Sequence, residues 1–172
     1  MIFLTYLIIY VPKFDYIYGR IFSFFNKETG THNFQSEKAI ESITSGGFFG
    51  KGIGEGTLKN KVPEAHTDYI ISVISEEFGV VAIMLILLLF LILIYMVFKK
   101  INYEKSEKIK LILIGCVSLI LMQATIHVGV NIRLFPTTGM TLPFLSYGGS
   151  SIVSISILSG IILNLTKRKI NH

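Results

Sequence analysis

Three long apolar runs without charged residues constrain this chain more than any other feature of its sequence. They are residues 78–98, 111–132 and 148–166, and each is free of Lys, Arg, Asp and Glu. A bilayer core about 30 Å thick needs roughly 20 apolar residues at about 1.5 Å per residue. With 51% of all residues hydrophobic and only 16% charged, the composition favours a membrane protein over a water-soluble globule. The sequence therefore predicts an all-α polytopic integral membrane protein.

Basic residues between these runs predict their orientation, because short loops rich in Lys and Arg stay in the cytoplasm. The link 99–110 and the tail 167–172 are both basic, whereas the link 133–147 carries only Arg133. We therefore expect 99–110 and 167–172 in the cytoplasm, and 133–147 outside together with the segment before residue 78. The net charge of +5 does not indicate a nucleic-acid partner, since the basic residues flank apolar runs.

The segments upstream complete this topology for one domain covering residues 1–172. Residues 1–12 read as a truncated transmembrane helix and 13–38 as a cytoplasmic link. Residues 39–77 read as a short or oblique helix followed by an extracytoplasmic loop, so the chain must cross the membrane between about residues 34 and 56. The single cysteine, Cys116, lies in an apolar run and is expected to pack in the core.

A glycine-rich stretch, residues 46–56, is not a nucleotide-binding loop. Lys51 is followed by Gly52 instead of Ser or Thr, and no preceding strand is visible. Two interpretations are open. The stretch is either a flexible interfacial loop, or its backbone and Lys51 hold an anionic headgroup.

The segment 62–70 places several polar side chains directly before a long apolar helix: Glu64, His66, Thr67 and Asp68. If the helix begins near Thr67 as its cap, then Asp68, Ser72 and Glu76 share one face. Acids in a first helical turn also complement the helix dipole, which is the plain explanation for Glu76. Asp68, next to His66 at the membrane boundary, is the candidate for chemistry. The spacing His-Glu-x-x-His of a metalloprotease is absent.

A polar stripe runs along the second apolar run, where Gln123, His127 and Asn131 recur every four residues. It marks either an inward face or simple hydrogen bonding between helices. At its outer end, Arg133 is a candidate anion contact, because guanidinium binds phosphate in a bidentate manner.

The link 133–147 contains prolines and glycines that no regular helix accommodates, so we expect a re-entrant turn. At its end and directly after it lie Ser146, Tyr147 and Ser150, which either line a cavity or satisfy freed backbone groups.

At these residues the chain resembles the SEDS family (shape, elongation, division and sporulation) of polytopic peptidoglycan glycosyltransferases. Residues 45–57, 63–79 and 136–151 resemble the family's three signature blocks in order and spacing, and 20–25 resembles its cytoplasmic link. The motifs resemble the division branch more than the elongation or sporulation branches, although Thr138 stands where division proteins often carry lysine. The resemblance implies that this chain is the C-terminal half of a larger helical bundle.

The resemblance also implies an activity, the polymerisation of lipid II outside the bacterial inner membrane at the division septum. Asp68 occupies the place of the family's essential acid, as a general base or as a ligand of Mg²⁺ or Mn²⁺ on the pyrophosphate. Glu64, His66 and Thr67 would tune it, and Lys51 and Arg133 would neutralise the leaving pyrophosphate. The implied partners are a class B penicillin-binding transpeptidase and other divisome proteins.

Two other functions are compatible with the same residues. Polar stripes and broken helices are also typical of transporters, which makes a lipid II flippase the alternative from a different class. A shortened gene product could instead act as a non-catalytic divisome scaffold.

Overall fold

The computed structural model describes residues 31–62 and 65–167, and this part of the chain is helical without strands. The helices are α3 (Thr31–Gly46), α4 (Leu58–Lys61), α5 (Ile70–Tyr103), α6 (Glu107–Asn131) and α7 (Gly149–Thr166). Among the described residues, α5, α6 and α7 are long and apolar enough to cross a membrane. The prediction of an all-α polytopic membrane protein is confirmed for this part of the chain.

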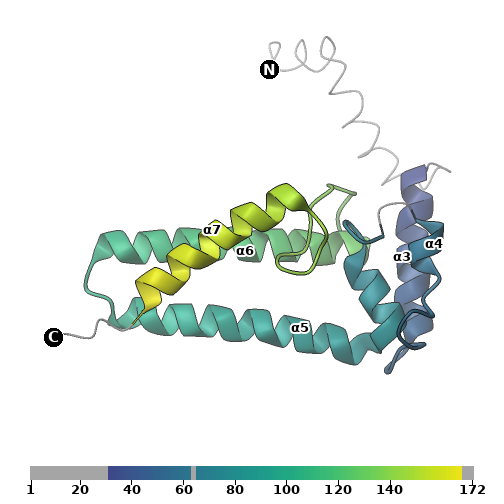
Figure 1. Cartoon of the computed structure of the whole chain (residues 1–172), viewed down its shortest axis with the longest axis horizontal. Coiled ribbons are helices and arrows are strands. Elements are labelled where there is room, and N and C mark those ends of the chain that lie inside the picture. The colour runs from purple at the N-terminus through teal and green to yellow at the C-terminus, as the bar shows by residue number, and fades with distance from the viewer. Residues whose placement is uncertain (1–30, 63–64, 168–172) are drawn as a thin grey trace, which may run out of the picture.

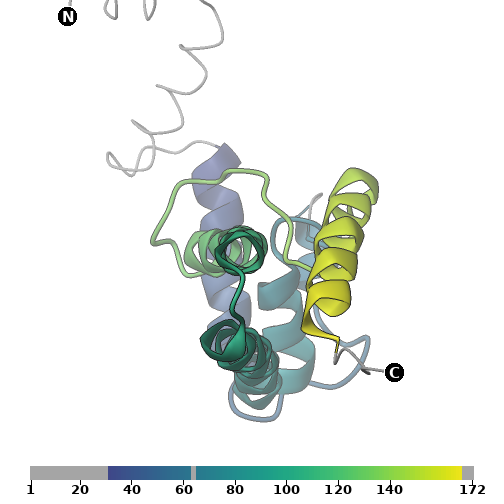
Figure 2. The ribbon, with the colours of Figure 1, turned by 90° about the vertical axis from the view of Figure 1, so that its left-hand side faces the viewer.

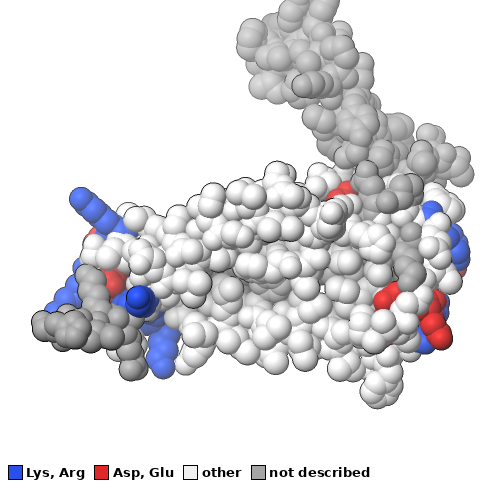
Figure 3. Space-filling view, in the orientation of Figure 1, with Lys and Arg blue, Asp and Glu red and all other residues white. Residues whose placement is uncertain are grey.

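Helices α5 and α6 run antiparallel as a hairpin, and α7 slants beside them (Figures 1 and 2). Lys, Arg, Asp and Glu gather at the two ends of the long axis, and the face in Figure 3 is uncharged between them. We call the end where α5 begins and the α6–α7 link lies the site end. The link between α5 and α6 lies at the opposite end.

Apolar side chains pack into a core at each end of the bundle. At the site end, Ala39 of α3, Leu58 of α4, Tyr69 and Val130 of α6 belong to one buried cluster. At the opposite end the cluster joins α5, α6 and α7 and includes Cys116, as predicted for the cysteine. A third cluster, Ile71, Ala124 and Leu142, joins α5, α6 and the α6–α7 link between these two cores.

Helix α3 differs from the expectation for this region. It is one helix from Thr31 to Gly46, so it crosses the predicted boundary between 13–38 and 39–77. It lies across the site end, packed against the first part of α5 and steeply inclined to the rest of that helix (Figure 1). Lys38 pairs with Glu41 on it, and this hydrogen bond holds the pKa of Glu41 below its ordinary value. Among the described residues, α3 is not one of the helices that are long and apolar enough to cross a membrane. The crossing predicted between residues 34 and 56 stays a prediction, and residues 1–30 lie outside the description.

The glycine-rich stretch is inserted into the hydrogen-bond ladder of α5. At Gly79 the helix is interrupted by non-helical backbone, φ 77° and ψ −179°. The two amides after it would ordinarily donate to the carbonyls of Glu76 and Glu77. Residues 47–52, which we call the insertion loop, supply the partners instead. Their carbonyls accept from the two amides, Val80 N to Gly47 O (3.0 Å) and Val81 N to Phe48 O (3.4 Å). Their amides donate to the two carbonyls, Lys51 N to Glu76 O (2.8 Å) and Gly52 N to Glu77 O (3.1 Å).

This insertion needs glycine at the contact points because the two backbones nearly touch. A Cβ on Gly79 would lie 2.1 Å from the carbonyl oxygen of Phe48. A Cβ on Gly50, at φ +78°, would lie 2.2 Å from that of Glu77. The glycines therefore serve a close approach between two backbone segments, a role that neither interpretation of the stretch included.

Candidate active site

Asp68 lies in a turn immediately before α5. The helix begins at Ile70 with Tyr69 as its N-cap residue, and no side chain caps it. The prediction that Thr67 caps a helix starting there is therefore wrong. The side chain of Asn131 on α6 instead accepts from the first-turn amide of Ser72, which a local cap could have bound.

Three successive carbonyls of this turn each accept a hydrogen bond from a distant residue. The oxygen of His66 accepts from Tyr147 N (3.2 Å) and that of Thr67 from Ser146 Oγ (2.9 Å). The oxygen of Asp68 accepts from Asn131 Nδ2 (2.9 Å). The backbone of the turn is thus bound residue by residue, which restricts where the Asp68 carboxylate can lie.

The α6–α7 link folds back over this turn as a non-helical segment. Ser146 Oγ, while donating to Thr67 O, accepts from Leu142 N (2.7 Å). Gly139 of the link approaches Asp68, since a Cβ there would lie 3.8 Å from Oδ2 of Asp68. The Asp68 side chain is partly exposed, so its carboxylate can still be reached.

The polar stripe of α6 contacts the link and the turn. Gln123 Nε2 donates to Thr141 O (2.9 Å) and Ser151 Oγ (3.1 Å). Nδ1 of the buried His127 lies 2.7 Å from Met140 O. Asn131 completes the series at the turn. The stripe faces inward, and it also joins the link to α6 by hydrogen bonds. The two interpretations, an inward face and hydrogen bonding between segments, therefore each describe part of its role.

Arg133 ends α6 in an unusual backbone conformation for its residue type. The amide of Arg133 donates to Val130 O (3.1 Å) and that of Leu134 to Gly129 O (2.7 Å), which is a Schellman motif. The left-handed position of that motif, usually glycine, is Arg133 itself at φ 59°. Its Nη1 lies 3.5 Å from the exposed Glu37, and its buried Nη2 has no hydrogen-bond partner among the described residues.

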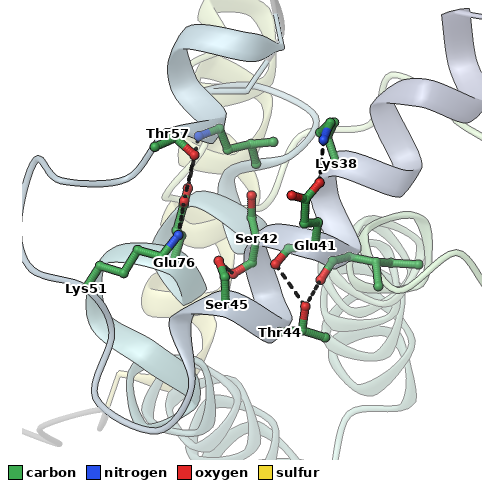
Figure 4. A network of polar contacts seen from close by, with 10 residues as sticks. Lys38, Glu41, Ser42, Thr44, Ser45, Lys51, Thr57 and Glu76 are labelled. Atoms are coloured by element: carbon green, nitrogen blue, oxygen red, sulfur yellow. Dashed lines mark hydrogen bonds and ion pairs between the residues drawn. The ribbon is translucent and has the colours of Figure 1, made fainter.

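Lys51 contacts a carboxylate of its own chain. The carboxylate of Glu76 is 1% exposed and receives Lys51 Nζ (2.9 Å), Thr57 Oγ1 (3.1 Å) and the amide of Leu58 (3.0 Å). Figure 4 shows Lys51 and Thr57 converging on it. Glu76 therefore anchors the insertion loop and α4 to α5. It was predicted to share a helix face with Asp68, but the two residues belong to separate hydrogen-bond networks, since Asp68 is bound through Asn131 of α6.

The structure brings together part of the predicted set. His66, Thr67 and Asp68 lie against Ser146 and Tyr147, while the exposed Ser150 begins α7. Ser146 satisfies backbone groups, which was one of its two predicted roles, and Glu64 lies outside the described residues. Two contributors were not among the predicted site residues, Asn131 and its partner Ser72. The only sequence signal for them was their spacing, because Asn131 follows His127 by four residues and Ser72 follows Asp68 by four.

A divalent cation fits this site in one mode only. Among residues 31–62 and 65–167, no three His, Cys, Asp or Glu side chains form a group that could hold a metal ion. The carbonyls of residues 66–68 already accept hydrogen bonds. Mg²⁺ is often bound by one or two carboxylates and completed by substrate phosphates and water, and Asp68 fits that arrangement.

Comparison with known proteins decides the family. The profile of the FtsW/RodA/SpoVE family, described as cell cycle protein, matches residues 1–171. The chain belongs to this family. Within it, the chain is 38% identical over 162 residues to a probable peptidoglycan glycosyltransferase FtsW of Enterococcus hirae, covering 92% of this chain and 41% of that protein.

Other members agree with this assignment. The chain is 37% identical to the probable peptidoglycan glycosyltransferase FtsW of Caulobacter vibrioides, covering 91% of this chain and 40% of that protein. It is 36% identical to the stage V sporulation protein E of Bacillus subtilis, covering 78% and 37%. The chain thus spans about two fifths of the first two relatives' length, 41% and 40%.

The fold also matches a solved structure, described as "Structural coordination of polymerization and crosslinking by a peptidoglycan synthase complex". The TM-score is 0.66 at 26% sequence identity, covering 96% of this chain and 47% of the other. The helical arrangement described above is therefore that of a family member, and the chain is a multi-pass membrane protein.

Proposed function

We propose that this chain supplies the acid-bearing segment of a peptidoglycan glycosyltransferase that polymerises lipid II on the outer side of the bacterial inner membrane during septal wall synthesis. One observation carries the proposal. Asp68 is the partly exposed carboxylate of a turn whose three carbonyls are bound by α6 and the α6–α7 link. The relatives named as probable peptidoglycan glycosyltransferases support the reaction class.

The proposed step is the transfer of a glycan from its lipid pyrophosphate to a sugar hydroxyl. The hydroxyl oxygen of the acceptor attacks the anomeric carbon of the donor, the bond from that carbon to the pyrophosphate oxygen breaks, and Asp68 takes the hydroxyl proton. A carboxylate within hydrogen-bond reach of that hydroxyl contributes about 10²–10⁴-fold. The second role open to Asp68 is to hold Mg²⁺ or Mn²⁺, which would supply positive charge to the pyrophosphate.

Of the two basic residues proposed for the leaving group, Arg133 is less engaged by its own chain. Its Nη1 lies 3.5 Å from the exposed Glu37, whereas Lys51 is paired at 2.9 Å with the buried Glu76. A non-glycine residue in a strained left-handed conformation is also more frequent at functional sites than elsewhere. We therefore assign the pyrophosphate contact to Arg133 and a structural contact to Lys51.

The test is polymerisation of purified lipid II by the full-length protein with its class B penicillin-binding transpeptidase. We expect Asp68→Asn to lower the rate by at least about 100-fold. Glu55→Gln, which neutralises an exposed carboxylate of the glycine-rich stretch, is the matched control and should retain activity. Normal polymer from Asp68→Asn would exclude the base role.

The same experiment separates the other functions. A flippase would move lipid II across vesicle membranes without making polymer, and a scaffold would do neither while still binding the transpeptidase. The solved relative belongs to a complex that combines polymerization and crosslinking, which supports the transpeptidase as a partner. Binding to further divisome proteins would be measured in the same membranes.

A further inference from the structure

The side-chain amide of Asn131, the last residue of α6, is completely used by four hydrogen bonds. Its Oδ1 accepts from Ser72 N (3.2 Å) and from Ser72 Oγ (2.7 Å). Its Nδ2 donates to Asp68 O and His127 O, both at 2.9 Å. Asn131 and Ser72 are both 0% exposed. The orientation of the amide follows from its neighbours, because Ser72 N can only donate and the two carbonyls can only accept.

These bonds place the amide of Asn131 between Ser72 N of α5 and Asp68 O of the preceding turn, two groups that a continuous helix would join directly. In a regular helix the amide of residue 72 donates to the carbonyl of residue 68. Here Ser72 N donates to one end of the Asn131 amide, and the other end donates to Asp68 O. A primary amide has the same donor and acceptor as a peptide group, so Asn131 acts as an additional peptide unit at the start of α5.

We propose that Asn131 is a positioning residue for Asp68, a role that rests on the proposed function. It does not reach substrate, since it is fully buried. It holds the carbonyl of Asp68 itself, while Ser146 and the amide of Tyr147 hold the two carbonyls before it. The Asp68 carboxylate extends from the residue whose backbone Asn131 binds. A displacement of that backbone by about 1 Å is enough to lower turnover by about 100-fold.

The variants separate the two ends of the amide. Asn131→Ala removes all four bonds. Asn131→Asp keeps acceptors for Ser72 but turns a carboxylate toward two carbonyls, so it should be at least as harmful as alanine. Ser72→Ala removes one of the four bonds and should have the smallest effect. Gln123→Ala is the matched control, because it removes three hydrogen bonds on the same face of α6 that do not reach the turn.

Two measurements are made on the full-length protein in nanodiscs. Amide hydrogen exchange should accelerate by at least about tenfold in the peptide covering residues 66–75 for Asn131→Ala, and not for Gln123→Ala. In the polymerisation assay, kcat should fall by about 10–100-fold with KM changed less than about twofold, because a buried residue contributes no substrate contact. The order of kcat should be wild type, Ser72→Ala, Asn131→Ala.

The results that overturn the proposal are specific. Unchanged exchange at residues 66–75 in Asn131→Ala, or an equal loss of kcat in Gln123→Ala at equal thermal stability, would make Asn131 an ordinary structural residue. If the wild type makes no polymer, the proposed function fails. In that case the exchange measurement still decides whether Asn131 holds the turn. The proposal that Asn131 positions a catalytic group is then refuted together with the proposed function.

Discussion

Replacing Gly79 by alanine should be among the most damaging single substitutions in the described part of the chain. Its backbone, at φ 77° and ψ −179°, lies in a region that is essentially restricted to glycine, and entering it costs another residue about 1–3 kcal/mol. The added Cβ would also stand 2.1 Å from Phe48 O and 2.6 Å from Gly50 N. Both neighbours are backbone atoms, so no side chain can rotate away.

To relieve that contact the insertion loop must move away from α5. Four hydrogen bonds join the two segments, and each contributes about 1 kcal/mol net. If the strain remains and half of the bonds are lost, Gly79→Ala lowers the free energy of unfolding by about 3–5 kcal/mol. Hydrogen exchange should accelerate at residues 47–52 and 76–81 together, because both sides of the ladder open.

The assay is unfolding in detergent, followed by helical circular dichroism. Two helical glycines serve as controls, Gly115 and Gly160, since a Cβ at either would meet nothing within 4 Å. Alanine there should stabilise the protein by about 0.5–1 kcal/mol. A Gly79→Ala protein within about 1 kcal/mol of wild type would refute the reasoning.

Arg133→Gly should leave stability unchanged or raise it by about 1 kcal/mol, because the relief of left-handed backbone strain outweighs a weak pair with the exposed Glu37. The same variant should lose at least about tenfold in polymerisation if the guanidinium contacts pyrophosphate; thermal stability and lipid II turnover measured together check this. Lys51→Met should destabilise the protein by about 1–3 kcal/mol by leaving the Glu76 carboxylate buried without its cation. Adding Glu76→Gln should recover part of that loss in a double-mutant cycle, and additive losses would contradict the pairing.

The sequence predicted the long helices well because their signal is local. A run such as 78–98 is apolar on every side, and hydropathy alone requires a helix in a bilayer. Residues 66–68 also stood out as candidates, since polar groups directly before such a run are costly unless they have a role; the structure adds that α6 and the α6–α7 link bind their carbonyls.

The contacts made by the glycine-rich stretch could not be predicted. Lys51 next to several glycines is typical of an anion-binding loop, whereas here the glycines allow backbone to contact backbone across Gly79. The start of α5 was mispredicted for a similar reason. Thr67 is a good capping residue by type, but α5 begins later, and it is Asn131, far along the sequence, that accepts from the first-turn amide of Ser72. Both errors concern hydrogen bonds between segments that local sequence patterns do not connect.

The two places where α5 is completed by other segments differ in when they can form during synthesis. The bonds of the insertion loop at Gly79 join residues 25 and 33 positions apart, so they can form as soon as the first part of α5 emerges. The bonds of Asn131 span 59 and 63 residues and require α6 to be in place. The turn that carries Asp68 is therefore among the last parts of this region to become ordered, and the acid is held in place only after the helices behind it have assembled.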